Sequence, residues 1–144
     1  MITFVTRAQN NHASQIYKLE TESFSDPWSV VSIIHEIEHS IFLVAMDLAD
    51  NIVGYVSMRH IMDEGHINNI AVSKEYRNQG IGSKLMDALL EIAQPNIKAL
   101  TLEVRASNKN AIYLYQKYGF IIEGYRKNYY NNPIEDAAIM WRYI

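Results

Sequence analysis

A glycine-containing loop offers the clearest chemistry in this sequence. Residues 77–82 (RNQGIG) follow an apolar run and precede a long amphipathic segment, a pattern that predicts a strand, a turn and a helix. The first turn of a helix has unpaired backbone N–H groups and the positive end of the helix dipole, and glycines let a phosphate approach that backbone. The loop therefore predicts an anion site, with an ordinary tight turn as the alternative. The sequence has neither a Walker motif nor a Gly-x-Gly-x-x-Gly fingerprint.

A second feature is an acidic residue in a predicted strand, residues 99–105. Apolar and polar side chains alternate there, and Glu103 lies on the polar face near the carboxyl end. Because a helix connects this strand to the preceding one, the two are expected to be parallel, and ligands in such sheets bind at the carboxyl ends of strands. Glu103 thus lies where a ligand is expected, although a salt bridge or an exposed strand position would also explain it.

Residues 35–39 (HEIEH) match the His-Glu-x-x-His signature of zinc proteases. At about 100° per residue, the apolar residues of this predicted helix form one stripe, whereas His35, Glu36 and His39 point roughly the opposite way. Zinc chemistry would need the histidine face directed inward, and the pattern instead directs it toward solvent. A solvated helix face is therefore the preferred interpretation.

The remaining pattern predicts the elements that must position these residues. Strands are expected at residues 2–7, 41–48, 52–62, 66–72, 99–105, 120–129 and 137–143, and helices at residues 11–24, 29–39, 81–94 and 110–118. Ser29 is a candidate cap for the second helix, and Pro95 and Gly119 are expected to end the third and fourth. The second, third and fourth strands are expected to form an antiparallel meander.

Length and composition favour one globular domain over residues 1–144, with 49% hydrophobic residues and a net charge of −3. The charge argues against nonspecific nucleic-acid binding and favours a basic peptide partner. No apolar run approaches the roughly 18 residues that span a membrane, and the N-terminus lacks signal-peptide features, so we expect a cytoplasmic protein without membrane contact. The absence of cysteine excludes a cysteinyl intermediate.

The loop at residues 77–82 resembles the Arg/Gln-x-x-Gly-x-Gly/Ala loop of the GNAT acetyltransferases, which holds the pyrophosphate of acetyl-coenzyme A (acetyl-CoA). The order of predicted elements is similar to the GNAT fold over essentially the whole chain. This resemblance implies an α/β (α+β) single domain with a mixed, mostly antiparallel seven-stranded sheet. Strands four and five would form a parallel central pair, and four helices would flank the sheet.

A narrower resemblance is to the RimI-type ribosomal-protein alanine N-acetyltransferases. It rests on residues 69–72 (NIAV), 102–108 (LEVRASN) and 111–115, on Gly119 with Phe120, and on residues 128–130 followed by 135–137. Related N-terminal acetyltransferases share many of these motifs. The resemblance implies acetyl transfer from acetyl-CoA, without a metal, to the N-terminal alanine of small-subunit ribosomal protein eighteen.

The same resemblance implies roles for individual residues. The family's general base falls on Glu103 and its general acid on Tyr115. The coenzyme is expected to contact Ile70, Ala71, Val72, Asn78, Gln79, Gly80, Ile81, Gly82, Ser83 and Asn108. From the residues alone, Tyr115 has the spacing of a core position and Asn108 could cap a helix, so structural roles are the alternatives.

Four further residues are candidates for contact with the peptide: Trp28, Tyr129, Tyr130 and Glu135. A tryptophan in a proline-containing loop is more typical of a lid that packs on the core, and the two tyrosines could simply pack. The expected partner is the basic N-terminal peptide of a ribosomal protein, with no direct nucleic-acid contact. We expect the enzyme to be a monomer or a weak dimer.

The chemistry suits these residue types. An α-amino group, with a pKa of about 7.7–8.0, has far more free base at neutral pH than a lysine at about 10.4. Glu103 could accept the amine proton directly or through water, and Tyr115 could protonate the coenzyme thiolate. Under this hypothesis Glu103→Gln would flatten the acidic limb of the pH profile. The alternatives are acetylation of another amine (another protein N-terminus, a polyamine or a small antibiotic), a non-catalytic coenzyme-binding module, and a zinc protease.

Overall fold

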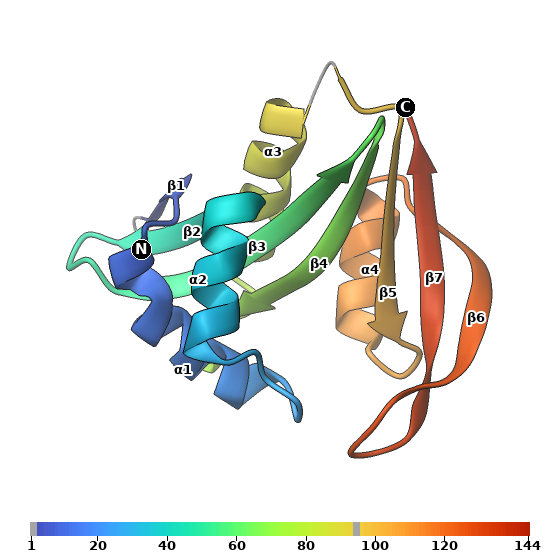
Figure 1. Cartoon of the computed structure of the whole chain (residues 1–144), viewed down its shortest axis with the longest axis horizontal. Coiled ribbons are helices and arrows are strands. Elements are labelled where there is room, and N and C mark those ends of the chain that lie inside the picture. Colours follow the sequence, from blue (N-terminus) through green and yellow to red (C-terminus); the bar gives the residue numbers. More distant parts are fainter. Residues whose placement is uncertain (1–2, 94–95) are drawn as a thin grey trace.

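The computed structural model describes residues 3–93 and 96–144, within which seven strands form one sheet (Figure 1). The strands are β1 (Thr3–Arg7), β2 (Ile41–Asp47), β3 (Ile52–Ile61), β4 (Glu64–Val72), β5 (Ala99–Arg105), β6 (Ile121–Tyr130) and β7 (Glu135–Tyr143). Their order across the sheet is β1-β2-β3-β4-β5-β7-β6. The β4–β5 pair is parallel and the other five pairs are antiparallel, which confirms the predicted mixed sheet.

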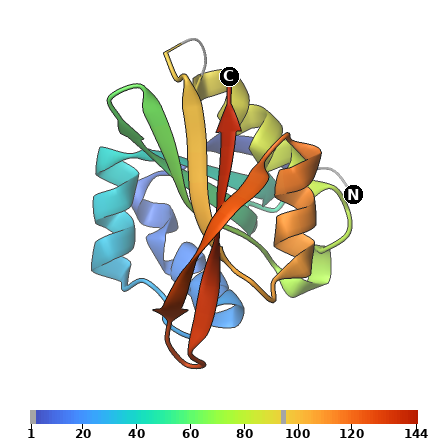
Figure 2. The ribbon, with the colours of Figure 1, turned by 90° about the vertical axis from the view of Figure 1, so that its right-hand side faces the viewer.

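Four helices cover the two faces of the sheet: α1 (Ala13–Ser23), α2 (Val30–His39), α3 (Ile81–Ala93) and α4 (Lys109–Lys117). Figure 2 shows α1 and α2 on one side of the sheet and α3 and α4 on the other. Ser29 caps α2, as expected, because its hydroxyl accepts a hydrogen bond from the Ser32 N–H (3.1 Å). No helix in the described part of the chain is long and apolar enough to cross a bilayer. The expected helix end at residues 94 and 95 lies outside that part.

Each pair of helices encloses its own apolar core. The core under α1 and α2 includes Ile16, Ile33, Phe42 and Tyr55, which are all buried. The larger core, against α3 and α4, takes from α3 the residues Ile81, Leu85, Met86, Leu89 and Ala93. Ile92 of α3 is 38% exposed, because the buried face of the helix is directed toward Met86 and Ala93. The two cores hold the helices against the sheet and so position the loops that join helices and strands.

The sheet opens between β4 and β5. The two strands pair only over Glu64–Ile67 and Ala99–Leu102, and their carboxyl ends then diverge (Figure 1). On the other side of β4, the register with β3 shifts between Ser57 and Met58, which lie opposite Asn69 and Ile67. Asn68 is therefore an extra residue in β4, a bulge of the kind that bends a strand and redirects its side chains. The last residues of β4 and β5 thus face a gap between the two strands.

A carboxylate is buried beside this gap. Glu20 of α1 is 1% exposed, and its Oε1 accepts a hydrogen bond from the Trp28 N–H (2.9 Å). Its Oε2 lies 3.5 Å from the Asn69 amide nitrogen. Burial raises the pKa of Glu20 from 4.5 to about 7, although the bonds from Trp28 and Asn69 act in the opposite direction. Glu20 therefore binds a proton more strongly in the folded protein than in the unfolded chain.

This raised pKa predicts a pH-dependent stability. Because the folded state holds more protons than the unfolded state between pH 4.5 and about 7, the free energy of unfolding should fall as pH rises through that window. Glu20→Gln should remove this fall in the free energy of unfolding, which amounts to a total on the order of 3 kcal/mol across the window. Urea denaturation at several pH values would measure it, with the exposed Glu22→Gln on the same helix as the control. Equal slopes for the wild type and Glu20→Gln would contradict the prediction.

Candidate active site

The larger cavity, of about 580 Å³, lies between the end of β4, the start of α3 and α4. Nine of the ten residues expected to contact the coenzyme line it: Ile70, Ala71, Val72, Asn78, Gly80, Ile81, Gly82, Ser83 and Asn108. The exception is Gln79, whose side-chain amide instead donates to the Glu75 carbonyl oxygen (3.2 Å). The structure thus gathers residues from three separate segments around one space.

The loop before α3 has the backbone of an anion cradle. Asn78 and Gly80 have φ values of 62° and 81°, in the left-handed region that asparagine and glycine tolerate. The Lys84 N–H donates to the Gly80 carbonyl oxygen (3.0 Å), so the helix begins directly after Gly80. The N–H groups of its first turn have no partners within the helix. A side chain at Gly82 would crowd this cradle, because its Cβ would lie 3.1 Å from Leu114 Cδ2.

Asn108 has the capping role that the sequence offered as an alternative, and its position is also compatible with the expected coenzyme contact. Its side-chain oxygen accepts a hydrogen bond from the Ala111 N–H (3.2 Å) and so caps α4. It also lies on the wall of the larger cavity and on that of a second, smaller one. The cap fixes the start of α4 at the place where the two cavities meet.

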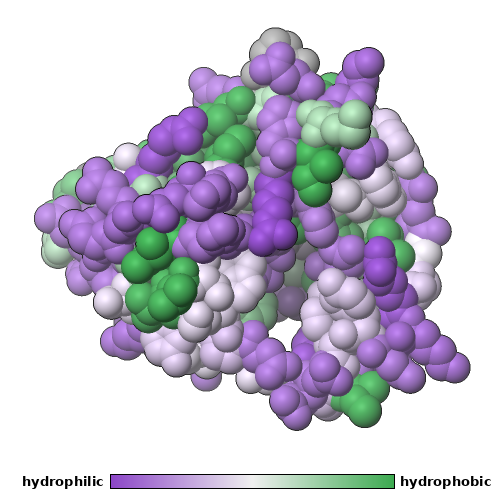
Figure 3. Space-filling view, viewed as in Figure 1, coloured by the Kyte–Doolittle hydropathy of each residue, from purple (hydrophilic) through white to green (hydrophobic). Residues whose placement is uncertain are grey.

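The smaller cavity, of about 260 Å³, lies in the gap between β4 and β5. It shares five lining residues with the larger cavity: Ser23, Phe24, Ile70, Asn108 and Ala111. Glu103 and Tyr115 both line it, together with Asn68, Asn69 and Tyr130. Figure 3 shows a hollow in the lower centre of this face, between the side that carries α1 and α2 and the side that carries β5, β6 and β7. A group bound in one cavity can therefore reach a group bound in the other.

Glu103 is held as a carboxylate by two neighbours. His66 Nε2 lies 2.7 Å from Glu103 Oε2, and Arg126 Nε lies 3.7 Å from Oε1. The hydrogen bond with His66 is the main reason why the pKa of Glu103 is lowered; burial acts in the opposite direction. The sequence analysis missed His66. The one available signal was that His66 is a polar residue in an otherwise apolar strand, and that this strand was expected to pair in parallel with the strand that carries Glu103.

Tyr115 presents a phenol to the same cavity. Its side chain is 4% exposed and packs against Phe120, with 5.7 Å between ring centroids. Burial, and secondarily the nearby Tyr130, raises the pKa of Tyr115 well above its ordinary value. The phenol therefore stays protonated at neutral pH and can act as a hydrogen-bond donor inside the cavity.

The structure brings one of the four peptide-contact candidates to the cavities. Tyr130 lines the smaller cavity, and the Arg105 guanidinium stacks on its ring at 4.6 Å. Burial raises the pKa of Tyr130 to about 12. Tyr129, Trp28 and Glu135 do not line either cavity.

These three residues support the walls instead. Tyr129 is 48% exposed and meets Tyr130 edge-on, with 5.0 Å between centroids. Trp28 packs on the core under α1 and α2, as a lid would. Glu135 accepts hydrogen bonds from Arg105 (3.2 Å) and from the Ser107 N–H (2.7 Å). Arg105 also donates to the Asn131 carbonyl oxygen (2.8 Å), so this arginine, which the sequence analysis did not single out, orders the loop between β6 and β7.

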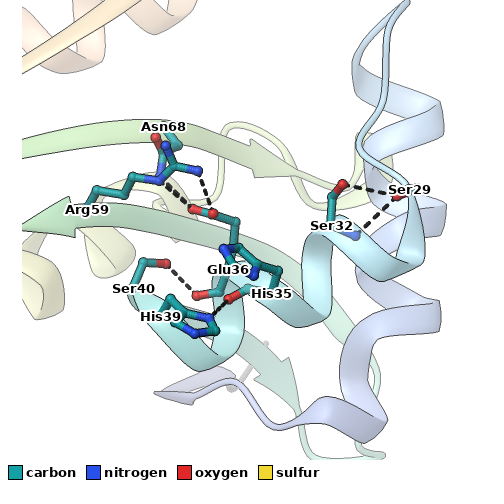
Figure 4. Close-up of polar contacts among 8 residues, drawn as sticks. All are labelled: Ser29, Ser32, His35, Glu36, His39, Ser40, Arg59 and Asn68. Carbon is teal, nitrogen blue, oxygen red and sulfur yellow. Dashed lines mark hydrogen bonds and ion pairs between the residues drawn. The ribbon is translucent and has the colours of Figure 1, made fainter.

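The interpretation of α2 as a helix with a solvated Glu36 is wrong. Glu36 is 3% exposed and forms a bidentate pair with Arg59, at 3.1 and 2.6 Å (Figure 4). Glu36 lies one turn from the buried Ile33, at the margin of the apolar stripe, and its long side chain reaches inward from there. His35 and His39 remain exposed and stack at 4.2 Å between centroids. Glu36 and the two histidines therefore do not converge on one point as a zinc-protease site requires.

Residues 13–120 match the sequence model of the acetyltransferase (GNAT) family. The chain belongs to the GNAT family. This match spans both cavities' main elements, from α1 to the end of α4, and confirms the family expected from the loop and the order of elements. The fold and the acetyltransferase class that the resemblance implied are thereby confirmed as well.

Relatives of this GNAT acetyltransferase cover most of its length. A Bacillus subtilis protein whose name assigns it provisionally to the ribosomal protein bS18-alanine N-acetyltransferases is 37% identical over 129 residues, 88% of this chain and 85% of that protein. The crystal structure of the Escherichia coli ribosomal-protein-S18-alanine N-acetyltransferase matches with a TM-score of 0.90 and 28% identity, over 99% of this chain and 94% of that one. The NatC complex bound to Gag peptide and CoA shares the fold, with a TM-score of 0.86 and 24% identity over 99% of each chain.

Gly82 offers a direct test of coenzyme binding in this GNAT enzyme. Gly82→Val should raise the Kd for acetyl-CoA about tenfold, because the branched side chain would contact Leu114 and fill part of the larger cavity. Isothermal titration calorimetry would measure it. Gly124→Val in β6 is the control, since a Cβ there has no neighbour within 4 Å. An unchanged Kd in Gly82→Val would show that the coenzyme phosphates bind elsewhere.

Proposed function

We propose that this GNAT acetyltransferase transfers the acetyl group of acetyl-CoA to the N-terminal alanine of ribosomal protein bS18. The observation that best supports the proposed acetyl transfer is that the two cavities meet. A cradle at the start of α3 opens onto a smaller cavity that holds a carboxylate and a phenol. The choice of acceptor rests on the names of the Bacillus subtilis and Escherichia coli relatives.

The larger cavity fits acetyl-CoA, which supplies an activated acetyl thioester. The backbone N–H groups at residues 80–83 would hold the pyrophosphate, and Gly82 leaves room for it. The end of β4, at Ile70, Ala71 and Val72, would line the pantetheine arm. Asn108, at the junction of the cavities, would contact the same arm near the reacting end.

Glu103 is the proposed base. It is ionised at neutral pH, partly buried, and faces the cavity where an amine would enter. A terminal amine needs little help, because its free base costs about 3.5 kcal/mol less to form than that of lysine. Glu103 accepts the amine proton as the new bond forms, either directly or through water, and His66 holds the carboxylate in place.

Tyr115 is the proposed donor to the departing sulfur. Its raised pKa lies above the thiol reference of about 8.5, so complete proton transfer from the phenol to a thiolate would be uphill. Tyr115 therefore stabilises the thiolate through a hydrogen bond while keeping its own proton. This role is narrower than that of the general acid implied by the resemblance.

The contact between His66 and Glu103 predicts a change in pH dependence. His66→Ala removes the main cause of the lowered pKa of Glu103, while burial still raises it, so Glu103 should become protonated at a higher pH. The pH below which kcat/KM is lost through Glu103 should therefore move upward, although Arg126 Nε still lies 3.7 Å from Glu103 Oε1. A pH–rate profile would measure this, with the exposed His60→Ala as the control. Coincident profiles for wild type and His66→Ala would contradict it.

Mass spectrometry of a synthetic peptide would test the proposed function. The peptide carries the N-terminal sequence of the organism's bS18 and is incubated with the protein and acetyl-CoA. We expect a gain of one acetyl group on the terminal amine, and no gain on a matched peptide whose terminal amine is blocked. No gain on the free peptide, with acetyl-CoA binding intact, would reject bS18 as the acceptor and direct the search to other termini, polyamines or small antibiotics.

The same assay separates the remaining alternatives. A non-catalytic module would bind acetyl-CoA and release no free thiol with any amine. A zinc protease would cleave the peptide and lose activity with a chelator. Release of coenzyme thiol in step with peptide acetylation is the expected result.

A further inference from the structure

Glu36 is a buried carboxylate that the proposed reaction does not use. It extends inward from α2 and is held by both Arg59 Nε (3.1 Å) and Nη2 (2.6 Å). Its Oε1 also accepts a hydrogen bond from the side-chain amide of Asn68 (3.2 Å) (Figure 4). Glu36 therefore links α2, on which it lies, to β3 through Arg59 and to the bulge of β4 through Asn68.

These contacts determine the orientation of the Asn68 amide. Paired with an arginine, Glu36 is ionised and can only accept hydrogen bonds, so Asn68 must present its NH₂ group to it. The carbonyl oxygen, Oδ1, is then the end of the amide that Glu36 does not hold. Asn68 is also the extra residue of the bulge and lines the smaller cavity together with Glu103 and Tyr115. Asn68, with its amide oriented in this way, is thus part of the wall of the smaller cavity.

We propose that Asn68 orients the attacking amine: its Oδ1 accepts one N–H of the neutral amine while Glu103 accepts the other. This inference rests on the proposed function. A primary amine has two N–H hydrogens and one lone pair, so fixing both hydrogens fixes the direction of the lone pair. The hydrogen held by Glu103 leaves as the proton when the amide bond forms, and the hydrogen held by Asn68 stays on the product nitrogen. Glu36 and Arg59 are positioning residues in this arrangement.

Asn69, the next residue, has a side-chain amide that is less firmly oriented. Its amide nitrogen lies 3.5 Å from Glu20 Oε2, at the limit of a hydrogen bond. Glu20 has no arginine partner among the contacts of the described residues, and it can act as a donor when it is protonated. The Asn69 amide is therefore less firmly oriented than that of Asn68, which has an ionised partner.

Two peptides that differ in one hydrogen test the proposal. One begins with alanine and the other with N-methylalanine, whose neutral amine has a single N–H. Asn68→Ala should lower kcat/KM for the alanine peptide about tenfold and leave that for the N-methyl peptide nearly unchanged, because only the alanine peptide uses the second acceptor. Asn68→Leu, which is similar in size to asparagine, should give the same result without opening space. Thermal unfolding would show that both variants are folded.

The positioning role has its own readout. Glu36→Gln allows the Asn68 amide to turn, so the preference for the alanine peptide over the N-methylalanine peptide should become smaller in this variant too. Arg59→Lys should have the same effect, because lysine cannot form the bidentate contact with Glu36. Glu38→Gln, an exposed change on α2, is the control and should leave the preference unchanged.

Equal losses for the two peptides in Asn68→Ala, or no loss for either, would overturn the proposal. The sequence after the first residue is the same in both peptides. It is taken from the terminal-alanine peptide that the wild type acetylates fastest in a panel that includes the bS18 peptide. A failure of the bS18 sequence would therefore reject the proposed acceptor without removing this test.

Discussion

Glu103→Gln is expected to lower kcat about 10³-fold while leaving the Kd for acetyl-CoA unchanged. The amide cannot accept the amine proton, and Glu103 does not line the larger cavity, where the coenzyme is expected to bind. Glutamine keeps the size of the side chain and can still accept a hydrogen bond from His66. Steady-state kinetics with the peptide and calorimetry with acetyl-CoA would measure the two quantities separately.

The pH profile of this variant distinguishes the prediction made from the structure from the prediction made from the sequence. Because the hydrogen bond with His66 lowers the pKa of Glu103, the carboxylate is already ionised throughout the range from pH 5.5 to 9. Glu103→Gln should therefore lower the rate at every pH in that range. The remaining acidic limb reports the free-base fraction of the amine, whose pKa is about 7.7–8.0. The sequence alone predicted a flattened limb, and finding one would show that Glu103 titrates near neutral pH.

A control for this variant is Glu123→Gln, an exposed carboxylate on β6 whose contact is the Tyr143 hydroxyl. It changes the net charge by the same amount at a distance from the smaller cavity and should retain full activity. A loss in Glu123→Gln comparable with that in Glu103→Gln would assign the effect to overall charge rather than to proton transfer.

Tyr115→Phe is expected to lower kcat about 10²-fold, the cost of removing one hydrogen-bond donor from a developing negative charge. The ring stays packed against Phe120, so the fold and the Kd for acetyl-CoA should change little. The loss should be nearly independent of pH below about 9, because burial keeps the phenol protonated throughout that range. Single-turnover kinetics with the peptide would measure the chemical step.

Tyr17→Phe, an exposed change on α1, is the control for this variant. A further comparison uses an acetyl donor whose leaving group is more acidic than an alkyl thiol and needs less stabilisation. The deficit of Tyr115→Phe should shrink with that donor. A deficit that is equal for both donors, or an unchanged kcat with acetyl-CoA, would remove Tyr115 from the leaving-group role.

The sequence by itself determined the elements of this protein and the location of the loop that is proposed to hold the coenzyme. Strands and helices follow from apolar residues at periods of 2 and 3.6, and the Asn78–Gly80 backbone and the first turn of α3 are local features that need no distant partner. Nine of the ten expected coenzyme contacts line one cavity for the same reason, since most of them come from β4 and the loop that follows it directly. The exception, Gln79, shows that a motif position does not set the direction of its side chain.

The tertiary structure alone decided which polar side chains meet. His66 and Glu103 are 37 residues apart, and Glu36 and Asn68 are 32 apart, so their contacts depend on the strand pairing, the bulge and the divergence of β4 from β5. Hydrophobic periodicity assigns a residue to a face but does not show how far a long side chain reaches, and for this reason Glu36 was wrongly placed in solvent. Trp28 and Glu135, expected at the peptide site, do not line either cavity, because the Trp28 N–H is held by the buried Glu20 and the Glu135 carboxylate is held by Arg105 and the Ser107 N–H. Local pattern sets each element, whereas the contacts between elements set the chemistry of the site.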